Sequence, residues 1–150
     1  MKPSIRRAGL EDLPALLALE ERAFPTDRFN GRQFRHLLTR ARARFLVATQ
    51  ADHLLGYGVN LYRAGATRAR LYGIAVAEHA RGQGVASALI AALAADARSQ
   101  GCRSLGLEVR TDNTAAQRLY QRLGFQGEGS LSGYYEDGTA AVRMALALTA

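Results

Sequence analysis

The segment spanning residues 71–100 constrains the fold most, because it combines a buried strand, a glycine-rich turn and a long helix. Its first six residues are mostly apolar and include the β-branched Ile74 and Val76, which favours a core strand. From Val85 onward, apolar side chains recur at the 3.6-residue spacing of a helix with one buried face, and Gly101 provides a C-terminal stop. A strand that leads through glycines into a helix start predicts an anion-binding site.

The turn between this strand and this helix carries residues that suit an anion. The first N–H groups of a helix lack partners within the helix, and the aligned peptide dipoles leave a partial positive charge there. Gly82 and Gly84 allow the backbone to approach a ligand closely, and Arg81 adds a formal positive charge. A turn that merely connects a strand to a helix also uses glycine, so the pattern alone leaves both interpretations open.

The residues of the turn argue against two common phosphate-binding classes. The Gly-Lys-Ser/Thr ending of an ATP-binding P-loop is missing, and so is a GxGxxG motif near the chain start. Residues 81–86, Arg-Gly-Gln-Gly-Val-Ala, instead resemble the Arg/Gln-x-x-Gly-x-Gly/Ala signature of the GNAT acetyltransferases. This resemblance implies acetyl-coenzyme A as cosubstrate. The residues implied to bind it at the turn are Arg81, Gly82, Gln83, Gly84, Val85, Ala86 and Ser87.

The composition is that of one globular domain covering residues 1–150. Its hydrophobic fraction of 48% and charged fraction of 22% are typical of folded proteins. No segment reaches the about 18 to 20 apolar residues of a membrane span, and no signal run follows the start, so we expect a cytoplasmic protein without a membrane partner. Cys102 is the only cysteine, which excludes an intrachain disulfide and a cysteine-cluster metal site, and we expect no metal.

The positive charge of the chain is partly local. The formal net charge is +7, and residues 28–51 contain six arginines, Arg28, Arg32, Arg35, Arg40, Arg42 and Arg44, with no acid among them. This segment is compatible with an RNA-binding or phosphate-binding patch. Aromatic residues do not interleave with the arginines in the way that single-strand binders need. A solvated helix face is therefore the favoured interpretation, and nucleic acid is not an expected partner.

Periodicity and turn residues predict a mixed α/β domain. Helices are expected at residues 11–24, 31–40, 85–100 and 113–123, and strands at residues 4–8, 45–49, 54–61, 71–76, 104–109, 125–131 and 141–148. This order predicts one sheet of about seven strands with four flanking helices, parallel in the middle and antiparallel at both ends. In GNAT proteins the middle parallel strands splay apart and hold the pantetheine arm. The resemblance implies that backbone groups of Ile74, Ala75 and Val76 bind it.

A second resemblance lies at residues 107–125, which read Leu-Glu-Val-Arg-Thr-Asp-Asn-Thr-Ala-Ala-Gln-Arg-Leu-Tyr-Gln-Arg-Leu-Gly-Phe. They are similar to a segment of the bacterial ribosomal-protein alanine N-acetyltransferases, which modify a protein α-amine. The two motifs stand in the matching order and spacing. The resemblance implies an acetyl-coenzyme A-dependent N-acetyltransferase in which a primary amine, such as a protein N-terminus, attacks directly in a ternary complex.

Two residues of this segment suit amine acetylation. An α-amine has a pKa of about 7.7 to 8, so a base must accept its proton before or during attack on a thioester. Glu108 lies on a strand face opposite the apolar Leu105, Leu107 and Val109, where it suits a base acting through water and equally a salt-bridged carboxylate. Tyr120 lies on a helix face that periodicity assigns to the core. The resemblance implies that Tyr120 lies beside the cofactor sulfur as proton donor.

The remaining assignments concern the cofactor arm and the acceptor. Asn113 is expected to cap a helix, and the resemblance implies that it also meets the cofactor arm. Tyr134 and Tyr135 are implied to bind the acceptor. The chain has no tryptophan, although the ribosomal enzymes usually carry one shortly after the proline that corresponds to Pro25. The acceptor therefore stays open between a protein N-terminus and a small amine, the alternative being a non-catalytic coenzyme A-binding or RNA-associated module. A monomer or a homodimer is expected.

Overall fold

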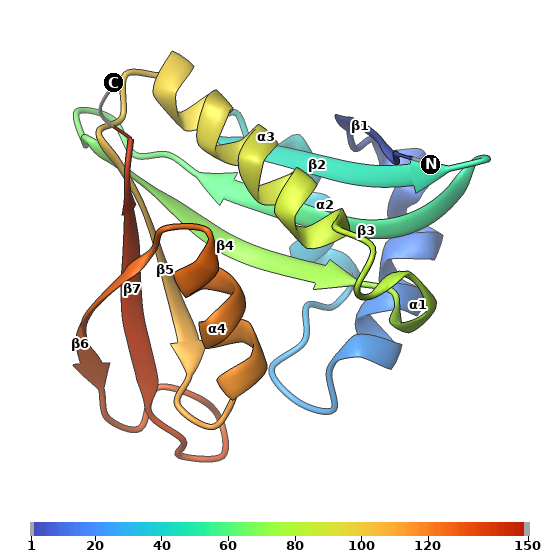
Figure 1. Cartoon of the computed structure of the whole chain (residues 1–150). Coiled ribbons are helices and arrows are strands. Elements are labelled where there is room, and N and C mark those ends of the chain that lie inside the picture. The colour runs from blue at the N-terminus through green and yellow to red at the C-terminus, as the bar shows by residue number, and fades with distance from the viewer. Residues whose placement is uncertain (1, 149–150) are drawn as a thin grey trace.

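The computed structural model describes residues 2–148. Within them lie seven strands, four α-helices and two short 3-10 helices, η1 (Leu10–Asp12) and η2 (Glu78–Ala80) (Figure 1). The strands are β1 (Ser4–Arg7), β2 (Ala43–Gln50), β3 (His53–Leu61), β4 (Arg68–Val76), β5 (Ser104–Arg110), β6 (Gln126–Leu131) and β7 (Ala141–Ala147). The helices are α1 (Leu13–Ala23), α2 (Gly31–Thr39), α3 (Val85–Ser99) and α4 (Thr114–Arg122). None of the helices in this part of the chain has both the length and the apolar character needed to cross a bilayer.

All seven strands form one sheet in the order β1-β2-β3-β4-β5-β7-β6. Neighbouring strands are antiparallel except β4 and β5, which run parallel. Parallel neighbours need a crossover connection, and α3 supplies it. The mixed sheet predicted from the sequence is therefore confirmed, with one parallel pair at its middle.

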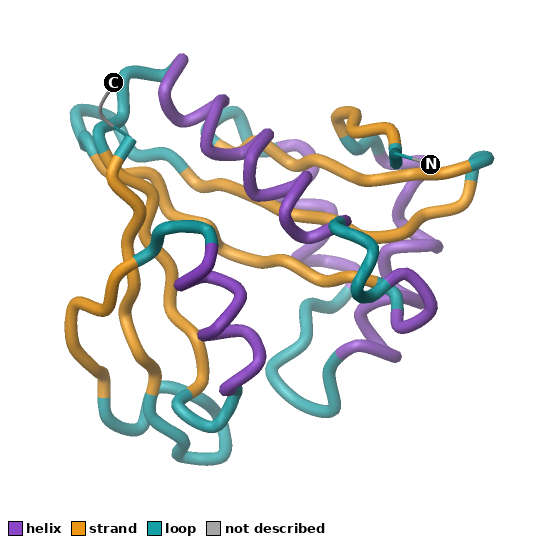
Figure 2. Tube along the Cα trace, in the orientation of Figure 1, coloured by secondary structure: helices purple, strands orange, loops and turns teal. Residues whose placement is uncertain are grey.

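The parallel pair β4 and β5 is joined at one end only. Residues 68–70 pair with residues 104–106, whereas β4 continues to Val76 and β5 to Arg110. Figure 2 shows the two strands diverging beyond the paired ends, β4 toward α1 and β5 beside α4. The splayed pair implied by the GNAT resemblance is present, and along the divergent part each strand has a backbone edge that pairs with no strand of residues 2–148.

Helices cover the two faces of the sheet and give each its own core. The helices α3 and α4 lie on one face, and α1 and α2 lie on the other (Figure 1). On the first face, Leu89 and Leu93 of α3 are fully buried against β2, β4 and β5. On the second, Leu16 of α1 and Phe34 of α2 are fully buried against β2 and β3. The half of the sheet formed by β5, β7 and β6 lacks this second helical layer.

Several element boundaries differ by a few residues from the sequence-based prediction, and two of them have a clear local cause. β4 begins at Arg68 rather than at residue 71, because Ala69 is buried in the α3 face while the arginines on either side of it lie on the opposite face. A search for apolar runs therefore missed the first residues of the strand, because two of them are charged. The first long helix begins at Leu13 after a 3-10 turn, in which the Asp12 carboxylate accepts the Gly9 N–H at 2.8 Å.

Candidate active site

The start of α3 presents unpaired backbone amides, as the sequence predicts. Gly84 is the N-cap residue and has no side-chain cap, and the first amide to bond back within the helix is that of Ala88, which donates to Gly84 at 3.0 Å. The N–H groups of the three residues between them therefore have no helical acceptor. Gly82 and Gly84 have φ angles of 77° and 80°, and an added Cβ at either would meet no heavy atom within 4 Å. The left-handed backbone favours glycine here, and the space around both residues is open.

The free edge of β4 faces the gap toward β5. Ala77 donates its N–H to Leu55 of β3 at 2.8 Å. Successive residues of a strand direct their N–H and C=O groups to alternate edges, so Val76 and Ile74 direct theirs away from β3. Ala75 pairs with Tyr57 of β3. A bulge follows at Tyr72, which the β3–β4 register skips. Two of the three residues predicted to bind the cofactor arm thus have backbone groups on the unpaired edge, and the binding roles of all three stay predictions.

Glu108 projects from β5 on the face opposite the α3 core, as its alternation with Leu107 and Val109 predicts. Its carboxylate is paired with Arg70 of β4, whose Nη2 lies 2.6 Å and whose Nε lies 2.9 Å from Oε1. Tyr134 donates a longer bond of 3.3 Å to the same oxygen. The Glu108 side chain is 11% exposed. The ion pair with Arg70 is a contact that the sequence analysis missed, because it depends on two strands distant in sequence.

Tyr120 of α4 is buried on the other face of β5. Its side chain belongs to the α3-side core, and its ring packs against Phe125 with centroids 5.6 Å apart. Burial, and to a smaller extent the neighbouring Tyr135, raises the pKa of Tyr120 to about 12. The phenol is therefore protonated at neutral pH. Glu108 and Tyr120 approach the divergent part of β5 from opposite faces.

Asn113 has the capping role that the sequence predicts. It is the N-cap of α4, and its side chain accepts the Ala116 N–H at 3.1 Å. Its second predicted role, a contact with the cofactor arm, stays a prediction.

The loop between α1 and α2 and the loop between β6 and β7 are tied together. Asp27, in the loop between α1 and α2, accepts from Arg110 at 3.0 Å and from the Glu136 N–H at 3.1 Å. Arg110 also pairs with Asp137 and lies over the ring of Tyr135, 5.0 Å from its centroid. We call this set of contacts the loop clamp. Asp137 is therefore engaged by Arg110, and this pairing holds the pKa of its carboxyl well below the usual value.

The predicted acceptor residues Tyr134 and Tyr135 lie beside this clamp. Their rings meet edge to face with centroids 4.9 Å apart. The Tyr134 hydroxyl accepts from Arg70 Nη2 at 2.6 Å, which brings it next to Glu108. Burial raises the pKa of Tyr135 to about 12. Tyr134 is 40% exposed, and its role toward an acceptor stays a prediction.

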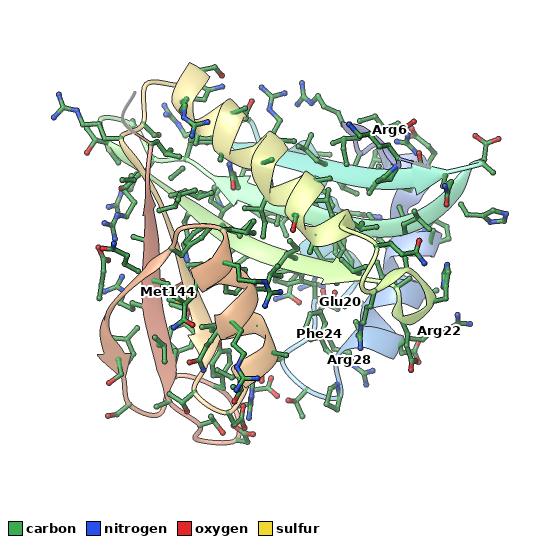
Figure 3. All side chains as sticks on the ribbon, viewed as in Figure 1. Arg6, Glu20, Arg22, Phe24, Arg28 and Met144 are labelled. Atoms are coloured by element: carbon green, nitrogen blue, oxygen red, sulfur yellow. The ribbon has the colours of Figure 1, made fainter. Side chains whose placement is uncertain are left out.

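Glu20 of α1 is a buried carboxylate that the sequence analysis did not single out as a site residue. It is 2% exposed and accepts the Tyr57 hydroxyl at 2.6 Å and the Phe29 N–H at 2.8 Å. Glu20, Phe24 and Arg28 lie together where the chain leaves α1 (Figure 3). Burial raises the pKa of Glu20 above its usual value, against the effect of its two hydrogen bonds. The sequence signal for Glu20 was an acidic residue at a position of α1 where helical spacing predicts an apolar side chain.

A cavity of about 570 Å³ opens beside Glu108, on the face of the sheet that lacks a second helical layer. It reaches from Tyr134 and Arg70 along the paired ends of β4 and β5 to Arg63. No group of three or more histidine, cysteine, aspartate or glutamate side chains in residues 2–148 is placed to hold a metal ion.

Known proteins share this arrangement. An N-alpha-acetyltransferase of Sulfurisphaera tokodaii is 30% identical over 155 residues, covering 96% of this chain and 92% of the relative. The crystal structure of the ribosomal-protein-S18-alanine N-acetyltransferase from Escherichia coli matches with a TM-score of 0.88 and 29% identity, over 99% of this chain and 95% of that chain. The structure of Ard1 from Thermoplasma volcanium matches with a TM-score of 0.91 and 30% identity, over 100% of both chains. The pattern of the acetyltransferase (GNAT) family matches residues 12–125, and this chain therefore belongs to that family.

Proposed function

We propose that the chain transfers the acetyl group of acetyl-coenzyme A to a primary amine, the α-amine at a protein or peptide N-terminus, by direct attack in a ternary complex. The observation that carries the proposal is the unpaired edge of β4 beside the open start of α3, with Glu108 on one face of the neighbouring β5 and Tyr120 in the core on the other. Relatives named for acetylation of a ribosomal protein and of protein α-amines support this acceptor class.

The residues fit the cosubstrate in two places. The free amides at residues 85–87 suit the pyrophosphate, and Arg81 and Gln83 lie in the same turn. The backbone groups of Ile74 and Val76 on the open edge suit the amides of the pantetheine arm. When bound, acetyl-coenzyme A supplies an acyl group already activated as a thioester. The protein contributes alignment of that group along β4 and donors near its carbonyl oxygen.

Proton transfer is assigned to the two side chains at the gap. The amine attacks the acetyl carbon, the new N–C bond replaces the C–S bond, and two proton movements balance the step. Glu108 takes the proton that the amine loses, directly or through one water molecule, and Tyr120 gives a proton to the departing sulfur. The burial that raises the pKa of Tyr120 to about 12 keeps this proton in place at neutral pH.

The test is acetylation of a peptide library by the purified protein, with mass spectrometry to locate the acetyl group and a thiol assay to follow coenzyme A release. We expect α-amine acetylation, and about a 100-fold or greater loss of kcat in Glu108→Gln. Glu21→Gln, on the exposed side of α1, is the matched control and should retain full turnover. Transfer to small amines alone would favour the small-molecule alternative, and an unchanged rate in both Glu108→Gln and Tyr120→Phe would overturn the catalytic assignment.

Two further assignments belong to this proposal. A cytoplasmic location is proposed from the single, buried cysteine, because proteins of oxidising compartments more often rely on paired cysteines. The earlier expectation of a monomer or a homodimer also stays a prediction, and sedimentation of the purified protein tests it.

A further inference from the structure

The cavity beside Glu108 is strongly basic. Five arginines line it, Arg40, Arg63, Arg68, Arg70 and Arg143, against two carboxylates, Glu108 and Glu128. Each carboxylate is already engaged by an arginine of the same cavity, Glu108 by Arg70 and Glu128 by Arg68 at 2.6 Å. The lining therefore carries a surplus of three positive charges beyond its internal pairs.

The surplus lies at the outer part of the cavity. Within residues 2–148, Arg40 and Arg63 have no carboxylate within 4 Å, and Arg143 lies only at 3.8 Å from the second oxygen of Glu108. Arg40 and Arg63 are both exposed. These guanidinium groups are thus available to an anionic ligand that enters from solvent.

A second cavity of about 580 Å³ extends the basic surface along α2. It shares Arg40, Leu61 and Arg70 with the first cavity and adds Arg32 and His36. We call the two together the arginine groove. Charged side chains of the α2 segment, which the sequence analysis interpreted as a solvated helix face, therefore continue directly to the residues around Glu108.

The loop clamp and the arginine groove lie on opposite sides of Glu108 along β5. Asp27 joins the α1–α2 loop to Arg110 and to the Glu136 N–H at the end of β5 that is away from the β4–β5 pairing. The groove reaches Glu108 from the opposite side, along the paired ends of β4 and β5. An acceptor whose amine meets Glu108 through the groove would lay its following residues against Arg40 and Arg63.

We infer that the acceptor is a polypeptide whose N-terminal segment is acidic, with carboxylates in the residues after the reactive amine that pair with the arginine groove. This inference rests on the proposed N-acetyltransferase function and specifies its substrate class. A basic segment would place like charges side by side in the groove, which disfavours it.

Nucleic acid is a weaker fit to the same groove. Single-strand binders combine cations with aromatic rings that are free to stack on bases. The ring of Tyr72 is already stacked on Phe29 with centroids 5.4 Å apart, and Arg70 lies 5.0 Å from its centroid. The Tyr134 ring meets Tyr135. These two aromatic rings thus have protein partners, whereas Arg40 and Arg63 form no ion pair with any residue in the range 2–148.

The test compares three peptides that share one N-terminal residue and differ in the next five, which are acidic, neutral or basic. Initial rates with acetyl-coenzyme A are measured for the wild type, for the double variant Arg40→Gln/Arg63→Gln, and for Arg98→Gln. Arg98 is an exposed arginine of α3, on the opposite face of the sheet, and controls for loss of charge alone. An oligonucleotide with the same net negative charge as the acidic peptide is added as a competitor in a parallel series of rate measurements.

We expect kcat/KM to be highest for the acidic peptide, by about tenfold over the neutral one, and to fall with salt. The double variant should lose most of this preference through KM, while Arg98→Gln keeps it. Equal rates for the three peptides, a preference for the basic one, or a preference that survives in the double variant would overturn the inference alone. Tight competition by the oligonucleotide, abolished in the double variant, without any preference among peptides would overturn it in favour of nucleic acid. Failure to acetylate any peptide would overturn the proposed function together with it.

Discussion

At the level of single residues, the ion pair between Arg70 and Glu108 restricts how Glu108 can take up a proton. The two nitrogens of Arg70 and the hydroxyl of Tyr134 all contact Oε1. Oε2 accepts no hydrogen bond from the residues that the structure describes, and Arg143 Nε lies 3.8 Å from it. Oε2 is therefore the oxygen that is open to an amine or to a bridging water. One fixed oxygen and one open oxygen orient the carboxylate without blocking it.

A first prediction at this scale concerns the Tyr120 hydroxyl. Tyr120→Phe should lower kcat by about 100-fold and leave the free energy of unfolding within about 0.5 kcal/mol, because the hydroxyl makes no hydrogen bond to another side chain of residues 2–148. The raised pKa of about 12 means that Tyr120 stays protonated up to pH 10. The wild-type rate should therefore not fall between pH 8 and pH 10 through loss of this proton. A pH–rate profile and thermal melts test both parts.

A second prediction at this scale concerns Glu20, which anchors the α1–α2 loop. Glu20→Leu removes both acceptor oxygens, so the Tyr57 hydroxyl and the Phe29 N–H lose their partner, at about 1–3 kcal/mol of stability. Phe29 stacks on Tyr72 at the arginine groove, so KM for the acceptor should rise while KM for acetyl-coenzyme A stays unchanged. Steady-state kinetics and urea unfolding measure these quantities. Glu21→Gln, the exposed neighbour, should change neither, and equal effects on both KM values would contradict a role confined to the loop.

At the level of elements, the turn before α3 depends on left-handed backbone. Gly84→Ala should cost about 1–2 kcal/mol of stability because its φ is 80°, and Gly84→Asn should cost less, since asparagine tolerates this conformation better. Both should raise KM for acetyl-coenzyme A, because the new side chain stands in front of the free amides. Gly65→Ala is a matched control, with φ of 74° and no heavy atom within 4 Å of an added Cβ. If Gly65→Ala raised that KM equally, backbone strain rather than the amide site would be responsible.

The elements also show what a sequence can predict. The α3 turn and the outward position of Glu108 follow from local patterns, because a helix start and the alternation of a strand are set within a few residues. The pairing of Arg70 with Glu108 and of Asp27 with Arg110 joins residues 38 and 83 positions apart. Such contacts depend on strand order and register, which hydrophobic periodicity does not encode. The early start of β4 was missed for a related reason, since its arginines line an open face.

At the scale of the whole molecule, the kind of basic residue matters as much as the net charge of +7. Nineteen of the 20 basic side chains are arginines, and Lys2 is the only lysine. Arginine stays protonated beyond pH 12, whereas lysine loses its proton near pH 10.4. The positive field around the arginine groove should therefore persist into alkaline solution and continue to attract anionic ligands there.

The same composition makes alkaline unfolding a readout of tyrosine burial. Burial raises the pKa of Tyr57, Tyr62, Tyr120, Tyr134 and Tyr135 above the usual value of about 10. A group whose pKa is higher in the folded than in the unfolded state binds more protons when folded, so its contribution is complete below pH 10 and is lost as the pH rises. The melting temperature should thus be steady from pH 7 to pH 9 and fall above about pH 10.

Absorbance at 295 nm measures tyrosine ionisation directly, because the chain has no tryptophan whose absorbance would overlap with that of tyrosinate. We expect these five tyrosines to form little tyrosinate while the protein is folded, so that most of the rise is cooperative and occurs when circular dichroism reports unfolding. Burial also raises the pKa of Cys102, so Cys102→Ala separates the thiol from the tyrosines, and it should leave the alkaline fall nearly unchanged. Tyr57→Phe should lessen that fall, because Tyr57 is the most deeply buried of the five. Gradual ionisation of all six tyrosines near pH 10 in a protein that remains folded would contradict the buried environments on both faces of the sheet.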